Sequence, residues 1–206
     1  LSLQLINVES KNVSSLTLPS TKCYGKLRSL ELKFVNPLPK IPKDEKFWNM
    51  KHIELWNTND FKNKKFSKYF PPVPLDAKTW KLGLLNFKNS DLTNEIPQSW
   101  KRLTKMKHLS LHNCDLHGPE PMNIIKNMKK IEVLSLSYND ITLDNFDFIK
   151  DFPKLKYVSL ANNTGVRGTL PKEVSVTCIF LHNTKVKIPQ IPPTTLLKNK
   201  TLGMIT

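Results

Sequence analysis

Hydrophobic residues recur along the chain in a fixed order, most clearly in the stretch 105–118, KMKHLSLHNCDLHG. There Met106, Leu109, Leu111 and Leu116 are apolar, and the small residue Cys114 follows three positions after Leu111. The pattern is L-x-x-L-x-L-x-x-[N/C]-x-L, and copies of it occur through most of the chain. Their first apolar positions are residues 27, 50, 82, 106, 131, 155 and 176. A period this regular predicts a stack of repeated units.

The centre of each copy, x-L-x-L, alternates polar and apolar residues over a few positions, which predicts one short β-strand per unit. A unit of about 24 residues cannot bury its apolar face alone, so neighbouring units must stack. The spacings between copies are 23, 32, 24, 25, 24 and 21 residues. The long spacing predicts an insertion, which we place at residues 62–79.

These copies resemble the leucine-rich repeat family over residues 27–192. The resemblance implies an α/β solenoid, a horseshoe with a curved parallel β-sheet on its concave side. Short helices, 3-10 turns and irregular segments are then expected on the convex side. The Asn or Cys place should lie in the turn after each strand, where a side chain can satisfy unpaired backbone groups. In this chain that place is held by Thr58, Ser90, Cys114, Asn139, Asn163 and Thr184.

The segments between the strands are of two kinds. Ile41-Pro42 and Ile96-Pro97 are each followed by bulky residues, as in plant-type repeats, a form that also occurs in secreted or surface bacterial proteins. Proline there favours a turn or short helix. The segments 121–130 and 143–152 lack this pair and space their apolar residues helically, which predicts short helices.

The two ends of the chain depart from the repeat. We expect residues 1–26 to form an N-terminal cap of one or two strands, because a solenoid end is an open apolar edge. The alternative is that they are the tail of a preceding domain. Residues 193–206 are expected to form a C-terminal cap or tail.

The chain is basic, with a formal net charge of +15. Residues 21–110 hold 19 Lys and Arg against 8 Asp and Glu, a net charge of +11. This basic N-terminal half suits an acidic partner, a polyanion or an anionic surface. The alternative is that its lysines only make the surface soluble. The insertion interleaves lysines with aromatic residues, so it is either a basic binding loop or a structural connection. The lysines are Lys62, Lys64, Lys65 and Lys68.

Signatures of catalysis are missing from the sequence. It contains no phosphate loop, no G-x-S-x-G and no dinucleotide fingerprint. Glu31 and Glu54 should lie on adjacent strands, but no third polar group is expected to converge on them. His108 and His112 share a strand about 13 Å apart, without a neighbouring Asp or Cys to complete a metal site. We therefore predict no enzyme, no cofactor and no metal.

The outward side chains of the strands form the best candidate site, because aromatic residues dominate protein interfaces. We predict non-enzymatic recognition of a macromolecule, most simply a protein, acidic or not, through the concave face. The alternative is a polyanion or glycan bound by the basic N-terminal half. The predicted contact residues are His52, Trp56, Lys88, His108, His112, Tyr138, Tyr157, Phe180 and His182.

Location is predicted from the same resemblance. Secreted or surface repeats of the Ile-Pro type favour an extracytoplasmic protein, and no run approaches the roughly 18 apolar residues of a membrane helix. The chain has three cysteines, which is too few for the disulfide-clamped caps of many extracellular relatives. That scarcity favours a bacterial origin.

Overall fold

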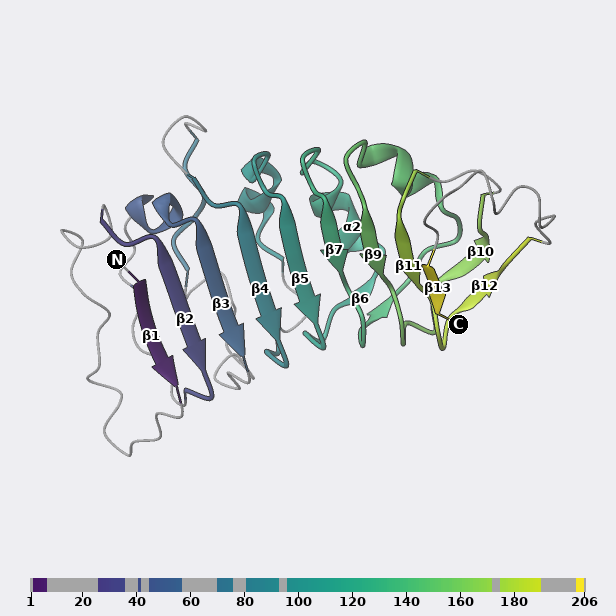
Figure 1. Ribbon diagram of the computed structural model, residues 1–206, viewed down its shortest axis with the longest axis horizontal. Helices are drawn as coiled ribbons and strands as arrows, with labels where there is room; N and C mark the ends of the chain where they lie inside the picture. Colours follow the sequence, from purple (N-terminus) through teal and green to yellow (C-terminus); the bar gives the residue numbers. More distant parts are fainter. Residues whose placement is uncertain are drawn as a thin grey trace.

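The computed structural model describes residues 2–6, 26–35, 41, 45–56, 70–75, 81–92, 96–171, 175–189 and 203–205. Its largest element is a β-sheet in which nine parallel strands follow one another in chain order (Figure 1). The parallel sheet predicted for a solenoid is confirmed. Its strands are β1 (Ser2–Ile6), β2 (Ser29–Lys33), β3 (His52–Trp56), β4 (Leu84–Lys88), β5 (His108–His112), β7 (Val133–Ser135), β9 (Tyr157–Ser159), β11 (Cys178–Phe180) and β13 (Gly203–Ile205).

Equivalent positions of neighbouring units lie side by side in this sheet. Leu30 of β2 is paired with Ile53 of β3, and Ile53 in turn with Leu85 of β4 and through it Leu109 of β5. All four are at most 1% exposed. Because successive side chains of a strand point to opposite faces, the residues between them face solvent. A slip by one residue would exchange the two faces, so the apolar pattern sets the register.

Short helical turns cover the other side of the sheet (Figure 1). They are η2 (Glu45–Asn49), η5 (Gln98–Arg102), α2 (Glu120–Ile125) and η6 (Asp147–Asp151). Of the two helices predicted from apolar spacing, the one in 121–130 is the α-helix α2 and the one in 143–152 is the 3-10 helix η6. Two small parallel pairs join neighbouring units, β6 (His117–Gly118) with β8 (Asp140–Ile141) and β10 (Arg167–Thr169) with β12 (Lys185–Lys187).

The Ile-Pro segments end in buried aromatic side chains. Pro97 directly precedes η5, and Trp100 within that helix is fully buried. Phe47, Phe70, Phe87 and Trp100 form a row of ring contacts with centroid distances of 5.6 to 6.0 Å. Large aromatic side chains bury roughly 150–250 Å² each, which corresponds to about 4 to 6 kcal/mol of transfer free energy at about 25 cal/mol per Å². This row therefore contributes strongly to the cohesion of the first units.

The described end of the insertion, residues 70–75, packs against this row. Phe70 and Val73 are buried. Trp48 Nε1 donates a hydrogen bond to the Pro71 carbonyl at 3.0 Å, and the Arg102 guanidinium donates to the Val73 carbonyl at 2.6 Å. Lys62, Lys64, Lys65 and Lys68 lie outside the described residues, so a binding role for that loop stays a prediction.

Asparagines in the turn after the strand hold successive units together. Asn139 Nδ2 donates to the carbonyls of Leu111, Leu136 and Ser137, while its Oδ1 accepts from the amides of Cys114 and Leu116. Asn139 thus satisfies backbone groups of the turn, as predicted for the Asn or Cys place of the repeat.

Neighbouring units use related contacts at the same place. Asn163 repeats the arrangement one unit later with the carbonyls of Leu136, Leu160 and Ala161. The Cys114 thiol donates to the carbonyls of Phe87 and His112, and burial raises its pKa far above the usual range.

Both ends of the chain contribute strands to the sheet. Ser2 of β1 pairs with Ser29 of β2 in the same register as the later units, and β13 pairs with β11. Residues 7–25 of the expected N-terminal cap, which include Cys23, lie outside the described part of the chain. Among the described residues, no helix has the length and hydropathy needed to cross a membrane.

Candidate functional site

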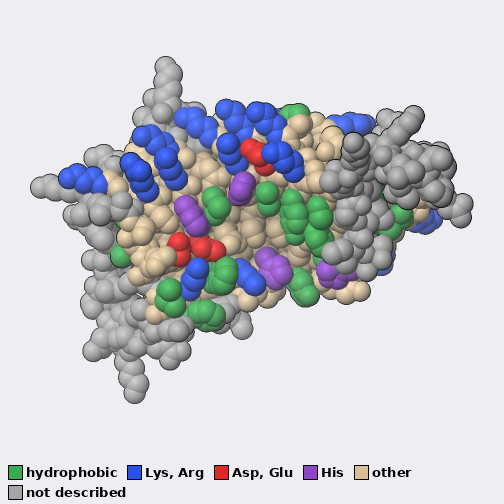
Figure 2. All heavy atoms as spheres, viewed as in Figure 1, with side chains coloured by type: hydrophobic (Ala, Val, Ile, Leu, Met, Phe, Trp, Pro, Cys, Tyr) green, Lys and Arg blue, Asp and Glu red, His purple; other side chains and the backbone are tan. Residues whose placement is uncertain are grey.

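The predicted contact residues of β3, β4 and β5 lie in rows across these strands. Figure 2 shows histidine, lysine and hydrophobic side chains close together on this face. His52, Leu84 and His108 are paired through the register of β3, β4 and β5, and Trp56 is paired with Lys88 in the same way. Lys88 is paired in turn with His112. The rows therefore lie on one face, as the period-2 pattern requires.

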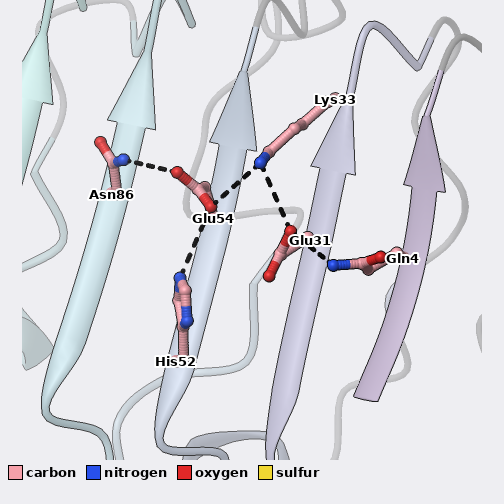
Figure 3. Close-up of polar contacts among 6 residues, drawn as sticks. All are labelled: Gln4, Glu31, Lys33, His52, Glu54 and Asn86. Carbon is pink, nitrogen blue, oxygen red and sulfur yellow. Dashed lines mark hydrogen bonds and ion pairs between the residues drawn. The ribbon is translucent and has the colours of Figure 1, made fainter.

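Six polar side chains meet at the N-terminal end of this face (Figure 3). Glu54, only 9% exposed, accepts a hydrogen bond from Asn86 Nδ2 at 2.8 Å. Lys33 Nζ lies 3.4 Å from one carboxylate oxygen of Glu54 and 3.4 Å from one of Glu31. Glu31 also accepts from Gln4 Nε2 at 2.9 Å. We call this group, with His52, the Glu54 cluster.

The Glu54 cluster corrects one expectation from the sequence. We expected no third polar group near the two glutamates, yet Lys33 and Asn86 converge on them from β2 and β4, and Gln4 reaches Glu31 from β1. The sequence alone did not reveal this because the contacts run across several strands. The signal that could have found it was the alternation at Leu1, Leu3 and Leu5, which marks β1 as another strand of the sheet.

Lys33 is the electrostatic centre of the cluster. Burial alone would lower the pKa of Lys33, but the charges of Glu54 and Glu31 and their hydrogen bonds outweigh it, so the pKa is raised. The same ammonium lies 4.5 Å from the centroid of the Trp56 ring, and Lys88 Nζ lies 5.3 Å from it. Trp56 is thus held between two cations, which restricts its ring to one place on the face.

Glu31, His52 and Glu54 could each offer one ligand atom to a metal ion, because those atoms lie within 4.8 Å of one another. Lys33 already provides a cation between the two carboxylates, which disfavours a second one there. The absence of a metal site stays a prediction. In the described part of the chain, His52 Nε2 and Trp56 Nε1 are buried atoms without a hydrogen-bond partner.

Two pairs of rings occupy the C-terminal half of the face. The rings of His112 and Tyr138 lie 4.9 Å apart between centroids, and those of Tyr157 and Phe180 lie 5.2 Å apart. We call them the two aromatic pairs. Burial lowers the pKa of His112 and the charge of Lys88 lowers it further. Burial also raises the pKa of Tyr157, and the nearby Cys178 adds to the rise.

Tyr138 stands out by its backbone as well as by its ring. Its φ is 58°, in the left-handed region that an aromatic residue rarely adopts. The equivalent place in four other units is held by Asn, which tolerates this conformation, and Phe34 holds it in the first. These asparagines are Asn89, Asn113, Asn162 and Asn183. The Tyr138 side chain is 51% exposed.

A pocket of about 570 Å³ opens beside Tyr138 at the strand ends. Its acidic residues, Asp91, Asp115 and Asp140, occupy one and the same place in three successive units. His117 lies 3.1 Å from Asp115 and 4.0 Å from Asp140. We did not predict this pocket from the sequence, although the aspartate two residues after the left-handed place was a visible signal.

Some positions that the period-2 alternation places on the outward face of the sheet are buried. Ser137, Ser159 and Ala161 are at most 6% exposed, and the hydroxyls of Ser137 and Ser159 are hydrogen-bonded to each other. His108 is exposed on β5. His182 is half-buried and shares a hydrogen bond of 2.9 Å with Asn162.

Comparison with known proteins gives two curated relatives from Arabidopsis thaliana. The chain is 30% identical to Receptor-like protein 41 over 95 residues and 26% identical to Receptor-like protein 39 over 95 residues, in both cases 45% of this chain. These stretches are 11% and 10% of the relatives. The chain thus spans about a tenth of the length of the curated relatives it matches. Its stacked units form a leucine-rich repeat solenoid, and its sequence is similar to these receptor-like proteins.

Solved structures give two further likenesses. One is the ectodomain of the Arabidopsis thaliana membrane receptor kinase GASSHO1/SCHENGEN3, in complex with CASPARIAN STRIP INTEGRITY FACTOR 2, with a TM-score of 0.43 and 16% identity over 88% of this chain and 18% of that one. The other is a leucine-rich repeat protein of Leptospira interrogans, with a TM-score of 0.34 and 17% identity over 95% of this chain and 79% of that one.

No protein-family model matches the sequence. The bacterial origin that the scarce cysteines favoured gains no support from the curated relatives, which are plant proteins. Cys114 is a buried thiol.

Proposed function

We propose that this leucine-rich repeat protein recognises a protein partner through the two aromatic pairs and the Glu54 cluster. The observation that carries the proposal is Tyr138, an aromatic residue that is half exposed in a left-handed backbone conformation. Strained residues persist at binding sites where the ring's placement matters more than stability. The buried Trp56 Nε1, which has no hydrogen-bond partner, supports the same interpretation, since buried unpaired polar atoms also cost stability.

The chemistry of the face suits a protein better than a small molecule. The face combines rigid aromatic side chains in its C-terminal half with charged and amide groups at its N-terminal end, and both kinds of group are common in protein interfaces. The face is broad, because neighbouring parallel strands are about 4.8 Å apart. The aromatic pairs and the Glu54 cluster thus lie at separate places along the face, and a partner as long as the face can contact both.

The proposal is tested by capture from an extracellular extract at low and high salt. The wild type is compared with the double variant Tyr138→Asn/Tyr157→Ser and with the control Leu75→Ser. Leu75 is 84% exposed, but it belongs to segment 70–75 and not to the proposed binding face. A partner retained at high salt by wild type and control should bind the double variant at least about 30-fold more weakly, the effect of losing about 2 kcal/mol at a hot spot. Equal binding by all three proteins would contradict the proposal.

We further infer that the chain acts outside the cell as the recognition part of a receptor-like protein. Its similarity to Receptor-like protein 41 supports this location. The test is to add a protease to intact cells that express the full-length protein with a tag in the repeat region. Loss of the tag without cell lysis is the expected result, and full protection of the tag until lysis would contradict it.

A further inference from the structure

The residues just before the strands form a continuous row across the sheet. A chain of backbone hydrogen bonds of 2.8 to 3.1 Å links each of them to the next unit, from the Arg28 carbonyl to the Lys51 amide and onward through Gly83. Equivalent residues of successive units are therefore held about 4.8 Å apart. The row is Arg28, Lys51, Gly83, Lys107, Glu132 and Lys156.

A second row lies two residues earlier in each unit, beyond the buried first apolar residue. It is also mostly basic, and its lysines are exposed or half-buried. Its members are Lys26, Asn49, Lys81, Lys105, Lys130 and Lys154. The two rows together hold nine Lys or Arg and one acidic residue, a net charge of +8 from the 12 positions. We call them the basic ridge.

The basic ridge forms one edge of the face that carries the aromatic pairs, and Figure 2 shows its blue side chains along the upper edge of the molecule. Six strands from β2 to β9 contribute to it, so its length is about 24 Å at about 4.8 Å per step. None of its 12 positions is aromatic. It thus presents cations at regular intervals without rings between them.

Glu132 is the one acidic member and it restrains two of the lysines. It forms ion pairs with Lys156 at 2.8 Å and with Lys107 at 3.7 Å. The hydrogen bond and the charge of Lys156 lower the pKa of Glu132, so this carboxylate is charged at neutral pH. It therefore offsets part of the attraction that the ridge exerts on an anion.

We propose that the basic ridge binds a linear acidic polysaccharide. A polymer with a carboxylate or sulfate on each repeating unit matches cations spaced by the strands, and charge complementarity drives its association. Single-stranded nucleic acid is disfavoured, because proteins that bind it usually stack its bases on aromatic side chains. The ridge is distinct from the aromatic pairs, so it provides a second function beside recognition of a protein.

The test measures binding of polygalacturonate and of heparin by titration at several salt concentrations, with dextran and a single-stranded oligonucleotide as comparisons. Lys51→Gln/Lys107→Gln/Lys156→Gln removes three ridge cations. The matched control, Lys126→Gln/Lys150→Gln/Lys185→Gln, removes three exposed lysines outside the ridge. Glu132→Gln removes the acidic member. Circular dichroism and unfolding midpoints check that each variant is folded.

The ridge variant should bind at least tenfold more weakly than wild type, and its slope of log affinity against log salt should be shallower by about 2 to 3, about one for each lost contact. The control should keep the wild-type slope, and Glu132→Gln should bind more tightly than wild type. The carboxylated and sulfated probes separate the two chemistries. Equal losses in ridge and control variants would overturn the proposal, as would tighter binding of the oligonucleotide than of either polysaccharide.

Discussion

Tyr138 shows how a single residue can be placed against the preference of its backbone. Left-handed geometry costs an ordinary residue about 1–2 kcal/mol, and Asn tolerates it. Tyr138→Asn should therefore raise the free energy of unfolding by about 0.5 to 1 kcal/mol, the lost contact with the His112 ring offsetting part of the gain. Urea unfolding measures the change.

Phe34→Asn is the companion variant, because Phe34 has a φ of 55° and is 46% exposed. It should stabilise the chain in the same way. If Tyr138→Asn lowers stability while Phe34→Asn raises it, then packing of the Tyr138 ring outweighs the backbone cost, and its conformation is no argument for function.

His112 makes the stability of the protein depend on pH. Its pKa is lowered by burial and by Lys88, so its stabilising contribution is complete above the unfolded pKa of about 6.5 and is lost as the pH falls through the lower folded pKa. Lys88→Met should raise the pKa of His112, which an NMR titration of the ring protons measures. An unchanged pKa would show that burial alone causes the shift.

At the scale of the element, each turn is held by one side chain that serves several backbone groups. Asn139→Ala would leave the Leu111 carbonyl and the amides of Cys114 and Leu116 without this partner, while the Leu136 and Ser137 carbonyls keep a second donor, so we expect a loss of about 3 kcal/mol or more in unfolding free energy. Asn123→Ala, an exposed position in α2, should change it by less than about 0.5 kcal/mol. Similar losses at both positions in chemical unfolding would contradict this account of the turn.

Strands and their outward faces could be predicted from the sequence because period-2 alternation repeats with a nearly constant spacing. Whether a convex segment forms an α-helix or a 3-10 helix could not be predicted, since α2 and η6 differ only in how the backbone closes its turns. The convergence on Glu54 depends on Lys33 of β2 and Asn86 of β4, which are far apart in the sequence and meet only because their strands flank β3. The acidic pocket depends on turns that bring Asp91, Asp115 and Asp140 to one side. These sites arise from contacts between units, which no single copy of the repeat displays.

In the described part of the molecule, the central strands have cations before them and carboxylates after them. The basic ridge precedes the strands, while the acidic pocket beside Tyr138 follows them. The aromatic pairs lie between these edges. A partner lying along the strands would therefore meet cations at one end and carboxylates at the other, which would fix the direction in which it binds.

The same charge distribution should make folding sensitive to ionic strength. Cations on neighbouring strands of the ridge repel one another by a few tenths of a kcal/mol per pair, and salt screens them as the Debye length falls from about 30 Å at 0.01 M to about 8 Å at 0.15 M. Raising sodium chloride over this range should increase the unfolding free energy by about 1 kcal/mol. The triple variant of Lys51, Lys107 and Lys156 should show a smaller increase, whereas the control of Lys126, Lys150 and Lys185 should respond as the wild type does. Identical salt responses in all three proteins would mean that the cations of the ridge are too well solvated to interact.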